Sequence, residues 1–531
     1  MKSMVFIYAG DSSSFSFEKV FSLQSAFDRV LVWSKSIESA CNFIACTQEN
    51  YEKVSSALAD LKLCNFKIIK KDSWSLGILL ESMALKASEN SVDNVIFTFA
   101  SMPFLDLNLT KQLLHDHDEY LSEYTFADGW PIGFAPEVID SGTLNILSSL
   151  CKAKEKENAV VTHDAVFDLM RLDINSFEIE SVISEKDYRM LRLEFLCNSK
   201  RNFLACKNLF EEALNTHTAF SATSLSNLAE KEVSVQKTVP AYYCIQLTEN
   251  MALPALYSPY PEAFQKKYSK LPFAESNPNP KTMSLESFNA LLSQIEELSS
   301  DAVISLSAWS DPLCVKNISE YVELAFKHKG FTVLLETDAS LLTDEAVQKI
   351  KNAVLSPERI IWIVSLDAFS DELYKKMHCG KGSLESAKNA VEKLSSSFPG
   401  SVYPQFTRMN INECELEGFY RFWSESSSPT LGKVIIQKYD WYCGLLPQEK
   451  PADLSPLERE PCWHIKRDVT VLCDGSVPLC REHILDQVLG NVFNEGLDFV
   501  WNKMNSFLEE HLSCKYNGLC EKCDEYYTFN F

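Results

Sequence analysis

The 531-residue chain has an ordinary globular composition, with 46% hydrophobic and 23% charged residues. A chain of this length folds as about two to four domains. Its net charge of −23 at pH 7 argues against a general nucleic-acid binder, whose binding surface is basic. The expected partners are therefore a peptide, a protein or a small molecule, and no nucleic acid.

The N-terminal residues MKSMVFIYAG contain only a short apolar run, without the pattern of a signal peptide. No apolar segment approaches the length of a membrane span. We therefore expect a cytoplasmic location, no membrane partner, and mostly reduced thiols among the 17 cysteines. Single cysteines in apolar runs, such as Cys41, Cys151 and Cys206, are expected in the core.

The first predicted domain, residues 1–235, alternates strand-like and helix-like segments. Strands are expected at 3–9, 29–34, 66–71 and 94–100, and a helix at 73–90. Such alternation predicts a doubly wound α/β domain, with helices on both faces of a mainly parallel sheet. Residues 181–215 have helical periodicity, with Ser184 and Asp187 as a weak capping signal at the start. A polar stretch at 228–237 indicates the boundary.

The alternation resumes in a second predicted domain, residues 240–445. Helix-like runs at 284–300 and 383–398 lie between strand-like runs at 242–248, 303–308, 332–337, 360–367, 402–409 and 433–440. Six βα units fit a partial (β/α)6 barrel, and an open doubly wound sheet would give the same pattern. The Pro- and Glu-rich stretch 445–461 then leads into a small third domain, residues 446–531.

The third domain contains six cysteines at distinctive spacings. Twelve residues separate Cys462 from Gly475, four more lead to Cys480, and Cys520 and Cys523 form a C-x-x-C pair 39 residues later. The Asp474-Gly475 turn is expected to fold the chain back, so that Cys480 approaches Cys462. Four thiolates arranged in this way suit zinc or an iron–sulfur cluster, and six reduced thiols in a small core are the alternative.

This order of features is similar to the SPASM domain, an auxiliary iron–sulfur module at the C-terminus of many radical-SAM enzymes. The resemblance implies one [4Fe–4S] cluster held by Cys462, Cys480, Cys520 and Cys523, with zinc as the fallback metal. The family pattern continues with further cysteines for a second cluster, and this sequence does not contain them. The remaining cysteines of the tail, Cys473 and Cys514, are expected to be spare.

The six βα units resemble the radical-SAM barrel that precedes a SPASM domain. Such a barrel begins with a strand and a C-x-x-x-C-x-x-C loop, whose thiolates bind the cluster that contacts S-adenosylmethionine (SAM). Here the three cysteine positions are Met251, Ala255 and Ser258, between the retained Tyr257 and Pro259. None of the three can supply the thiolate that the cluster needs. SAM is therefore an unlikely cofactor, and an unrelated α/β barrel is the alternative.

Other barrel landmarks are altered or kept. Where the family has a Gly-Gly-Glu-Pro-like turn, this sequence has AWSDP (308–312). Where a Thr-Asn-Gly turn is common, it has ETDAS (336–340). The segment SLDA (365–368) matches the family pattern well.

The start of the chain resembles a nucleotidyltransferase loop, of which Gly10 and Lys19 remain. Ser101 stands where the family has a metal-binding aspartate, so Mg²⁺-assisted nucleotidyl transfer is doubtful. Residues 127–139 resemble the sugar-recognition stretch of spore-coat-polysaccharide cytidylyltransferases. An unrelated doubly wound domain is the alternative.

The combination of a nucleotidyltransferase-like domain, a cysteine-less barrel and a SPASM tail resembles the spiro-SPASM family. The resemblance favours a pseudoenzyme or a redox or binding scaffold. One alternative is a sugar nucleotidyltransferase acting through the N-terminal domain. The other is a SAM-independent redox or peptide-modifying enzyme.

Overall fold

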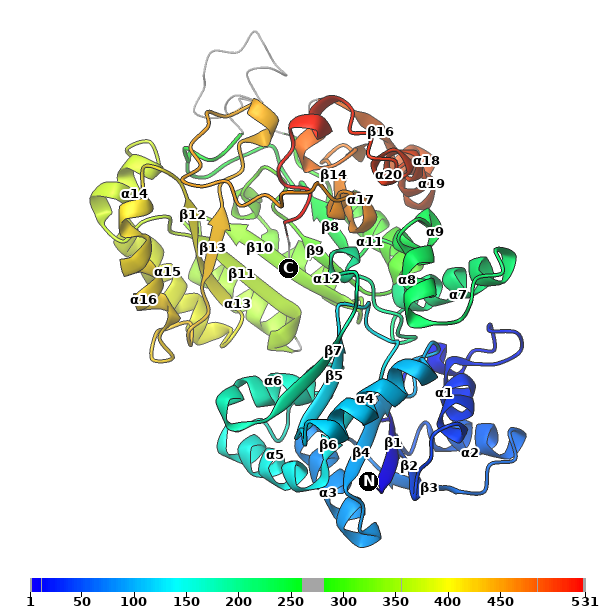
Figure 1. Ribbon diagram of the computed structural model, residues 1–531. Coiled ribbons are helices and arrows are strands. Elements are labelled where there is room, and N and C mark those ends of the chain that lie inside the picture. Colours follow the sequence, from blue (N-terminus) through cyan, green and yellow to red (C-terminus); the bar gives the residue numbers. More distant parts are fainter. Residues whose placement is uncertain (1, 11, 260–280, 355, 485, 529–531) are drawn as a thin grey trace. The chain divides into compact units, whose positions relative to one another are not determined.

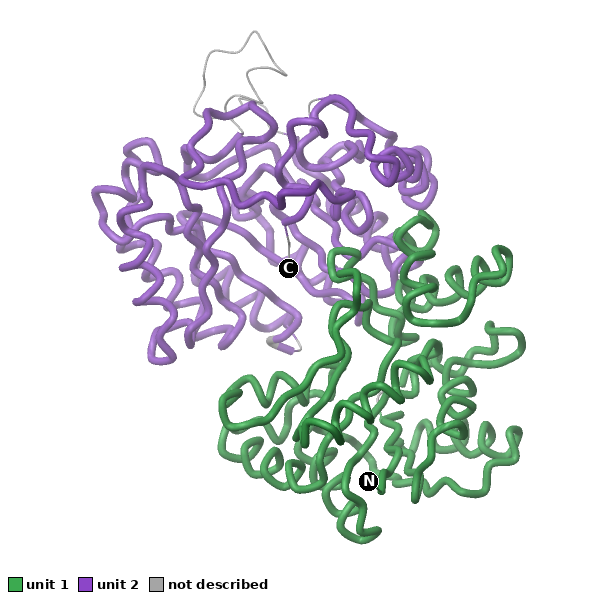
Figure 2. The backbone as a smooth tube through the Cα atoms, viewed as in Figure 1, with its two compact units in different colours: residues 1–238 green, residues 239–531 purple. Residues whose placement is uncertain are grey.

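The computed structural model describes residues 2–10, 12–259, 281–354, 356–484 and 486–528 (Figure 1). The chain forms two compact units, residues 1–238 and 239–531 (Figure 2). Among the described helices, none combines the length and the apolar character that crossing a bilayer requires. The last residues of the predicted cluster loop, 260–262, and the end of the chain, 529–531, lie outside the described residues.

The first unit is built on a seven-stranded sheet. Strands β3, β2, β1 and β4 are parallel, whereas β6 runs antiparallel to both β4 and β5. The order reverses at β1, because β2 and β3 lie on one side of it and β4 on the other, which confirms the doubly wound prediction. Across the sheet, the strands are β3 (Phe66–Lys71), β2 (Cys41–Thr47), β1 (Ser3–Ala9), β4 (Asn94–Phe99), β6 (Glu137–Asp140), β5 (Tyr124–Asp128) and β7 (Ile179–Ile183).

Helices cover both faces of this sheet, and the side chains of β1 alternate between two cores. Phe6 and Tyr8 pack with residues of α3, whereas Val5 and Ile7 pack with residues of α1 and α2. The alternation follows from the two-residue period of a strand. The helices of the unit are α1 (Ala26–Lys35), α2 (Tyr51–Asp60), α3 (Leu76–Asn90), α4 (Leu107–Glu119), α5 (Ser141–Ala153), α6 (Ala165–Arg171), α7 (Lys200–Asn215), α8 (Ala222–Ala229) and α9 (Val233–Gln236).

Three local predictions in this unit were wrong or incomplete. Residues 29–34, predicted as a strand, belong to helix α1, which starts with a reciprocal capping box between Ser25 and Asp28. The neighbouring strand is instead β2, which the sequence analysis did not identify. The helix expected from Ser184 begins only at Lys200, where the Ser199 side chain accepts a hydrogen bond from a backbone N–H.

The second unit contains a seven-stranded parallel sheet. The six predicted strands lie in sequence order without reversal, and each pairs in parallel with the next. A doubly wound sheet would reverse its order, so this arrangement is the partial barrel. Across the sheet, the strands are β13 (Ile435–Lys438), β12 (Val402–Arg408), β11 (Ile360–Ser365), β10 (Phe331–Thr337), β9 (Ala302–Ser305), β8 (Tyr242–Ile245) and β14 (Asp468–Val471).

The seventh strand, β14, comes from the cysteine-rich tail and was not predicted. It pairs in parallel with β8, with Val469 opposite Tyr243. The barrel helices are α11 (Leu285–Ser299), α12 (Ile318–Phe326), α13 (Asp344–Ala353), α14 (Asp371–Met377), α15 (Leu384–Ser397) and α16 (Leu416–Ser424). The tail adds α17 (Trp463–Arg467), the antiparallel pair β15 (Ser476–Pro478) and β16 (Val488–Asn491), α18 (Val492–Glu495), α19 (Leu497–Asn502) and α20 (Asn505–Leu512).

Candidate functional site

The first two predicted cluster cysteines lie on either side of a tight turn. Cys462 directly precedes α17, which leads into β14, and Cys480 follows β15 and directly precedes a 3-10 helix, η8 (Arg481–His483). Gly475 forms the turn between β14 and β15 with a φ of +83°, a value that favours glycine. A Cβ atom there would lie 2.2 Å from the Phe493 ring. The two strands pack together, as the Asp474-Gly475 signal predicted.

The other two predicted ligands lie in and directly after a short 3-10 helix near the end of the described residues. Cys520 lies within the 3-10 helix η9 (Gly518–Lys522), and Cys523 follows it. The backbone carbonyl of Cys520 accepts a hydrogen bond from the Arg459 guanidinium. The sulfur of Cys523 accepts a hydrogen bond from the backbone N–H of Glu525 at 3.4 Å.

The structure brings these four sulfur atoms into one electrostatic neighbourhood. Burial, and then the nearby charge of Cys523, raises the pKa of Cys462. Burial raises the pKa of Cys480, to which the charges of the other three cysteines also contribute. Burial and the charge of Cys523 raise the pKa of Cys520 to about 11. Four thiols, two buried and two half-buried, that would repel one another as anions are a donor set suited to a cationic metal or cluster.

Two further residues adjoin the predicted ligands and were missed by the sequence analysis. His483 places Nδ1 3.1 Å from the sulfur of Cys480 and Nε2 4.0 Å from that of Cys520. The neighbouring Cys443 thiol lowers the pKa of the Cys523 thiol to about 7. His483 and Cys520 are separated by 37 positions in the sequence, which leaves no spacing signal that could have identified the contact. Of the two cysteines predicted to be spare, Cys514 is exposed and Cys473 is buried.

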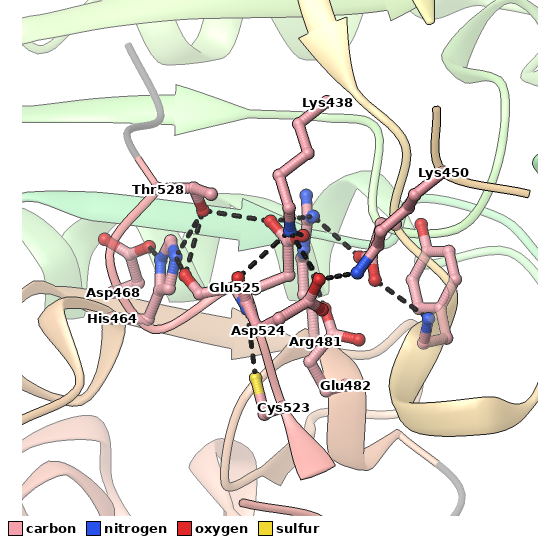
Figure 3. Close-up of polar contacts among 12 residues, drawn as sticks. Lys438, Lys450, His464, Asp468, Arg481, Glu482, Cys523, Asp524, Glu525 and Thr528 are labelled. Carbon is pink, nitrogen blue, oxygen red and sulfur yellow. Dashed lines mark hydrogen bonds and ion pairs between the residues drawn. The ribbon is translucent and has the colours of Figure 1, made fainter. Parts of the chain in front are cut away.

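A network of buried and partly buried ion pairs borders this cysteine site (Figure 3). Arg481, directly after Cys480, pairs with Asp440 at 3.0 Å and with Glu482 at 3.1 Å. Lys438 pairs with Glu525 and, at 3.0 Å, with Asp524, which Lys450 also contacts.

Carboxylate oxygens of Asp440, Asp524 and Glu525 lie within 4.8 Å of one another, a spacing compatible with a metal ion. Lys438, Lys450 and Arg481 already neutralise these carboxylates, so the group is a salt-bridge network.

The interior of the barrel contains a cavity of about 530 Å³. Its wall includes Arg481, Asp440 and Lys438 from the ion-pair network, so the cavity and the cysteine site share the segment Cys480–Arg481. Cys244 also lines the cavity, and burial raises the pKa of its thiol to about 12. The structure thus places Cys244 at the interior of the barrel.

The loop that would hold a SAM-binding cluster lines the same cavity and does not fit such a cluster. Met251, Ala255 and Ser258 all belong to the cavity wall. The Ser258 hydroxyl donates a hydrogen bond to the Met251 sulfur at 3.0 Å. The Tyr257 hydroxyl donates to a carboxylate oxygen of Asp367 at 2.7 Å. One hydrogen bond thus joins two residues of the loop and another joins the loop to Asp367, and its cysteine positions offer no thiolate.

One wall of the cavity is acidic. Asp311, in the AWSDP turn, accepts hydrogen bonds from Thr337 at 2.8 Å and from the backbone N–H groups of Leu313 and Asp338. Burial, and then the charge of Asp338, raises the pKa of Asp311 to about 7. Burial also raises the pKa of Glu336, which accepts a hydrogen bond from Gln405 at 3.0 Å. A ligand with a positive charge would relieve the repulsion between these carboxylates.

A second cavity, of about 360 Å³, lies in the first unit at the carboxyl ends of β1 and β4. Ser101 lines it, together with His163, Asp164 and Glu194, and its described wall contains no lysine or arginine. His163 contacts a carboxylate oxygen of Asp164 at 3.0 Å. Lys19, retained from the nucleotidyltransferase pattern, forms an exposed ion pair with Asp60 at 3.3 Å.

Comparison with protein families gives two matches. A family model described as the radical SAM superfamily matches residues 243–422, and the SPASM model, described as an iron-sulfur cluster-binding domain, matches residues 462–524. The first range includes the loop with Met251, Ala255 and Ser258, and the second includes all four predicted ligands.

The chain is also similar to individual proteins. An uncharacterized protein of Treponema pallidum is 39% identical over 378 residues, which cover 69% of this chain and 98% of that protein. A cytidylyltransferase structure from Leptospira borgpetersenii matches 44% of this chain and 96% of its own, at 15% identity and a TM-score of 0.36. A structure of BtrN in complex with AdoMet and 2-DOIA matches 52% of this chain and 88% of its own, at 15% identity and a TM-score of 0.33.

Proposed function

Since the chain belongs to the radical SAM superfamily and to the family of the Treponema pallidum protein, and has a C-terminal SPASM iron–sulfur domain, we propose a function for each part. We propose that the protein binds an iron–sulfur cluster and does not cleave SAM. Its tail holds one [4Fe–4S] cluster on Cys462, Cys480, Cys520 and Cys523. Its barrel serves as a binding cavity for a small molecule or a peptide side chain.

The observation that carries the cluster assignment is the gathering of four thiols, two of them buried and two half-buried, in one electrostatic neighbourhood. One thiolate for each iron satisfies a [4Fe–4S] cube, and such a cluster supplies one-electron transfer when bound. The donors around the thiols, such as the backbone N–H of Glu525 toward Cys523, can offset the negative charge of the ligands. Zinc bound by the same four thiolates is the alternative metal.

The loss of SAM cleavage follows from the loop at the barrel mouth. Reductive cleavage of SAM needs an iron–sulfur cluster at that loop. Because the three ligand positions are Met251, Ala255 and Ser258, the loop has no thiolate to hold such a cluster. A hydrogen bond joins Ser258 to Met251, so the first and third ligand positions contact each other. The cavity behind the loop is retained at about 530 Å³, a volume within the range of small-molecule sites.

Purification without oxygen tests both parts of the proposal. The protein should be brown and carry about four irons and four sulfides per chain, the content of one such cluster. With a strong reductant and SAM, it should form no 5′-deoxyadenosine above the level of a no-protein control. A colourless protein with stoichiometric zinc would overturn the cluster assignment. Protein-dependent 5′-deoxyadenosine, or about eight irons per chain, would overturn the barrel assignment.

A SAM-independent redox role is favoured by the shared segment between the cluster site and the cavity. Arg481 lines the cavity and directly follows the proposed ligand Cys480. An electron could therefore pass between the cluster and a substrate, either a peptide or a small molecule, that is bound beside Arg481. Oxidation or reduction of a bound compound that depends on the cluster would support this role, and Arg481→Gln should weaken it without removing iron.

Sugar nucleotidyl transfer at the first unit is the second candidate, supported by the cavity at the carboxyl ends of β1 and β4. Ser101 in its wall offers no carboxylate for Mg²⁺, so we expect no release of pyrophosphate from nucleoside triphosphates and sugar phosphates. Turnover above background with a panel of such substrates would establish the second candidate instead.

A further inference from the structure

The parallel sheet of the second unit is open, and its two edge strands are β13 and β14. Among the described residues, β13 pairs only with β12, and β14 pairs in parallel only with β8. β13 ends at Lys438, and β14 begins at Asp468. No strand pairing in the described part of the chain joins the two edges, so their connection depends on other contacts.

The segment that directly follows Cys523, residues 524–528, contacts the β13 edge, and we call it the clasp. The Glu525 carboxylate pairs with the ammonium group of Lys438, the last residue of β13. The same ammonium group donates a hydrogen bond to the Asp524 backbone carbonyl at 3.0 Å and pairs with the Asp524 carboxylate at 3.0 Å. Glu525 is only 2% exposed, so solvent screens its pair with Lys438 weakly.

The clasp also contacts the residues that hold the start of β14. The Glu525 backbone carbonyl is hydrogen-bonded to His464 Nε2 at 2.9 Å, and the Thr528 hydroxyl lies 3.2 Å from the same nitrogen. His464 Nδ1 lies 2.6 Å from a carboxylate oxygen of Asp468, the first residue of β14. Glu525 therefore contacts groups from both edges, with its side chain on β13 and its backbone on the β14 side (Figure 3).

The clasp adjoins the wall of the barrel cavity. Lys438 and Arg481 both line the cavity, and Glu525 pairs with each of them, with Arg481 at 3.8 Å. The rest of β13 lines the cavity as well. Movement of the clasp would therefore remove a carboxylate partner from two cations of the wall and one link between the edges of the sheet.

The clasp begins directly after a proposed ligand of the cluster, Cys523. A bound cluster fixes the chain at that residue, because the free energy of metal binding contributes to folding. We propose that the clasp closes the open side of the barrel while the cluster is bound, and that loss of the cluster releases the clasp and opens the cavity. The inference rests on the proposed cluster, to which it adds control over access to the barrel.

The experiment measures how fast Cys244, in the cavity wall, reacts with a dye-linked maleimide in the full-length protein. Mass spectrometry of the digested protein determines the extent of reaction at each cysteine separately. The wild-type protein is compared with its iron bound and after anaerobic removal of the iron with a chelator. Cys206 is buried in the first unit and is the internal reference for general unfolding.

Two variants weaken the clasp at either edge without changing a proposed ligand. Glu525→Gln removes the charge that pairs with Lys438, and Thr528→Val removes the hydroxyl that contacts His464. Glu495→Gln is the matched control, because it removes a carboxylate–lysine pair elsewhere in the tail. Iron content and circular dichroism are measured for each variant.

Removal of iron should make Cys244 react about tenfold faster or more, because the reaction follows the population of the open state, while Cys206 should be unaffected. Glu525→Gln and Thr528→Val should accelerate Cys244 with the iron still bound, and Glu495→Gln should not. Equal Cys244 rates with and without iron would overturn the proposal, as would unchanged rates in both clasp variants or equal acceleration of Cys206.

A wild-type protein that contains no iron when purified without oxygen would instead refute the proposed function. The contacts of the clasp would then be judged by the two clasp variants, whose Cys244 rates are compared with that of the wild type alone.

Discussion

Cys520 and Cys523 differ from Cys514 in what surrounds their sulfur atoms. Cys520 is buried, and Cys523 is half-buried and accepts a hydrogen bond from the Glu525 backbone N–H, whereas Cys514 is exposed. Replacing either Cys520 or Cys523 by alanine should therefore remove the cluster and lower the melting temperature, because metal-binding free energy contributes to folding in small metal modules.

Iron analysis and differential scanning calorimetry of the anaerobic protein measure both effects. Cys514→Ala is the control and should retain the iron and the melting temperature of the wild type. Equal losses at all three positions would show that the ligands are assigned wrongly.

The first unit contains a buried acid whose protonation should affect stability. Burial raises the pKa of Glu137 to about 7, above its usual value of 4.5, although His163 and a hydrogen bond from Tyr124 act in the opposite direction. The folded state therefore binds a proton that the unfolded state releases above pH 4.5. Stability is lost as pH rises from about 4.5 to about 7, by an amount on the order of 3 kcal/mol.

Glu137→Gln should remove most of this pH dependence, because the amide can still hydrogen-bond Tyr124 and carries no charge. Native-state hydrogen exchange of the β4 and β6 amides measures the effect. At pH 8 the variant should protect these amides better than the wild type does, and at pH 4 the two should be similar. A wild-type profile that is flat between pH 4 and pH 8 would contradict the assignment.

At the level of single residues, the sequence was informative where chemistry follows spacing along the chain. The C-x-x-C pair and the Gly475 turn identified the four candidate ligands, and the structure places these cysteines in one electrostatic neighbourhood. Cys443 and His483 could not be found in this way. Their contacts with Cys523, Cys480 and Cys520 arise only from the packing of separate turns.

The turn between β14 and β15 is the element on which the cysteine site depends most directly. Gly475→Ala would place a Cβ atom 2.2 Å from the Phe493 ring and 2.9 Å from the Asn491 side chain, at a φ of +83°. Gly400 is a matched control, because it has a φ of +76° but no atom within 4 Å of its added Cβ.

Gly400→Ala should cost only the backbone strain, about 1 kcal/mol. Gly475→Ala should destabilise the second unit further and also lower the iron content, since β15 leads into Cys480. Thermal unfolding and iron analysis of the two variants measure the difference. Similar behaviour of both would mean that the turn tolerates displacement of Phe493.

Secondary-structure elements were predictable where both faces of a strand are buried. The six barrel strands read as continuous apolar runs, as expected for a parallel sheet covered on both sides. Residues 29–34 read in the same way but form a helix, because Phe27, Val30 and Leu31 also fit a helical face and the Ser25–Asp28 capping box fixes its start. β14 was missed because its partner β8 lies more than 200 residues earlier in the chain.

At the scale of the whole molecule, the cysteine tail and the barrel are coupled through the β14–β8 pairing. Removing iron with a chelator should loosen the tail and, through β14, the β8 edge of the barrel sheet. Hydrogen–deuterium exchange should therefore accelerate in β8 and β14. The β1 and β4 amides belong to the other compact unit and should exchange at an unchanged rate. Uniform acceleration in both units would indicate global unfolding instead.

The same pairing has a consequence for how the protein is made on the ribosome. β8 forms near the middle of the chain, but the strand that covers its outer edge spans Asp468–Val471. While the intervening residues are being synthesised, the backbone groups along that edge have no strand to pair with, and such an edge invites association with other chains. The nascent barrel therefore depends on the late arrival of its final strand, and slow translation before residue 468 prolongs its exposure to aggregation and its need for a chaperone.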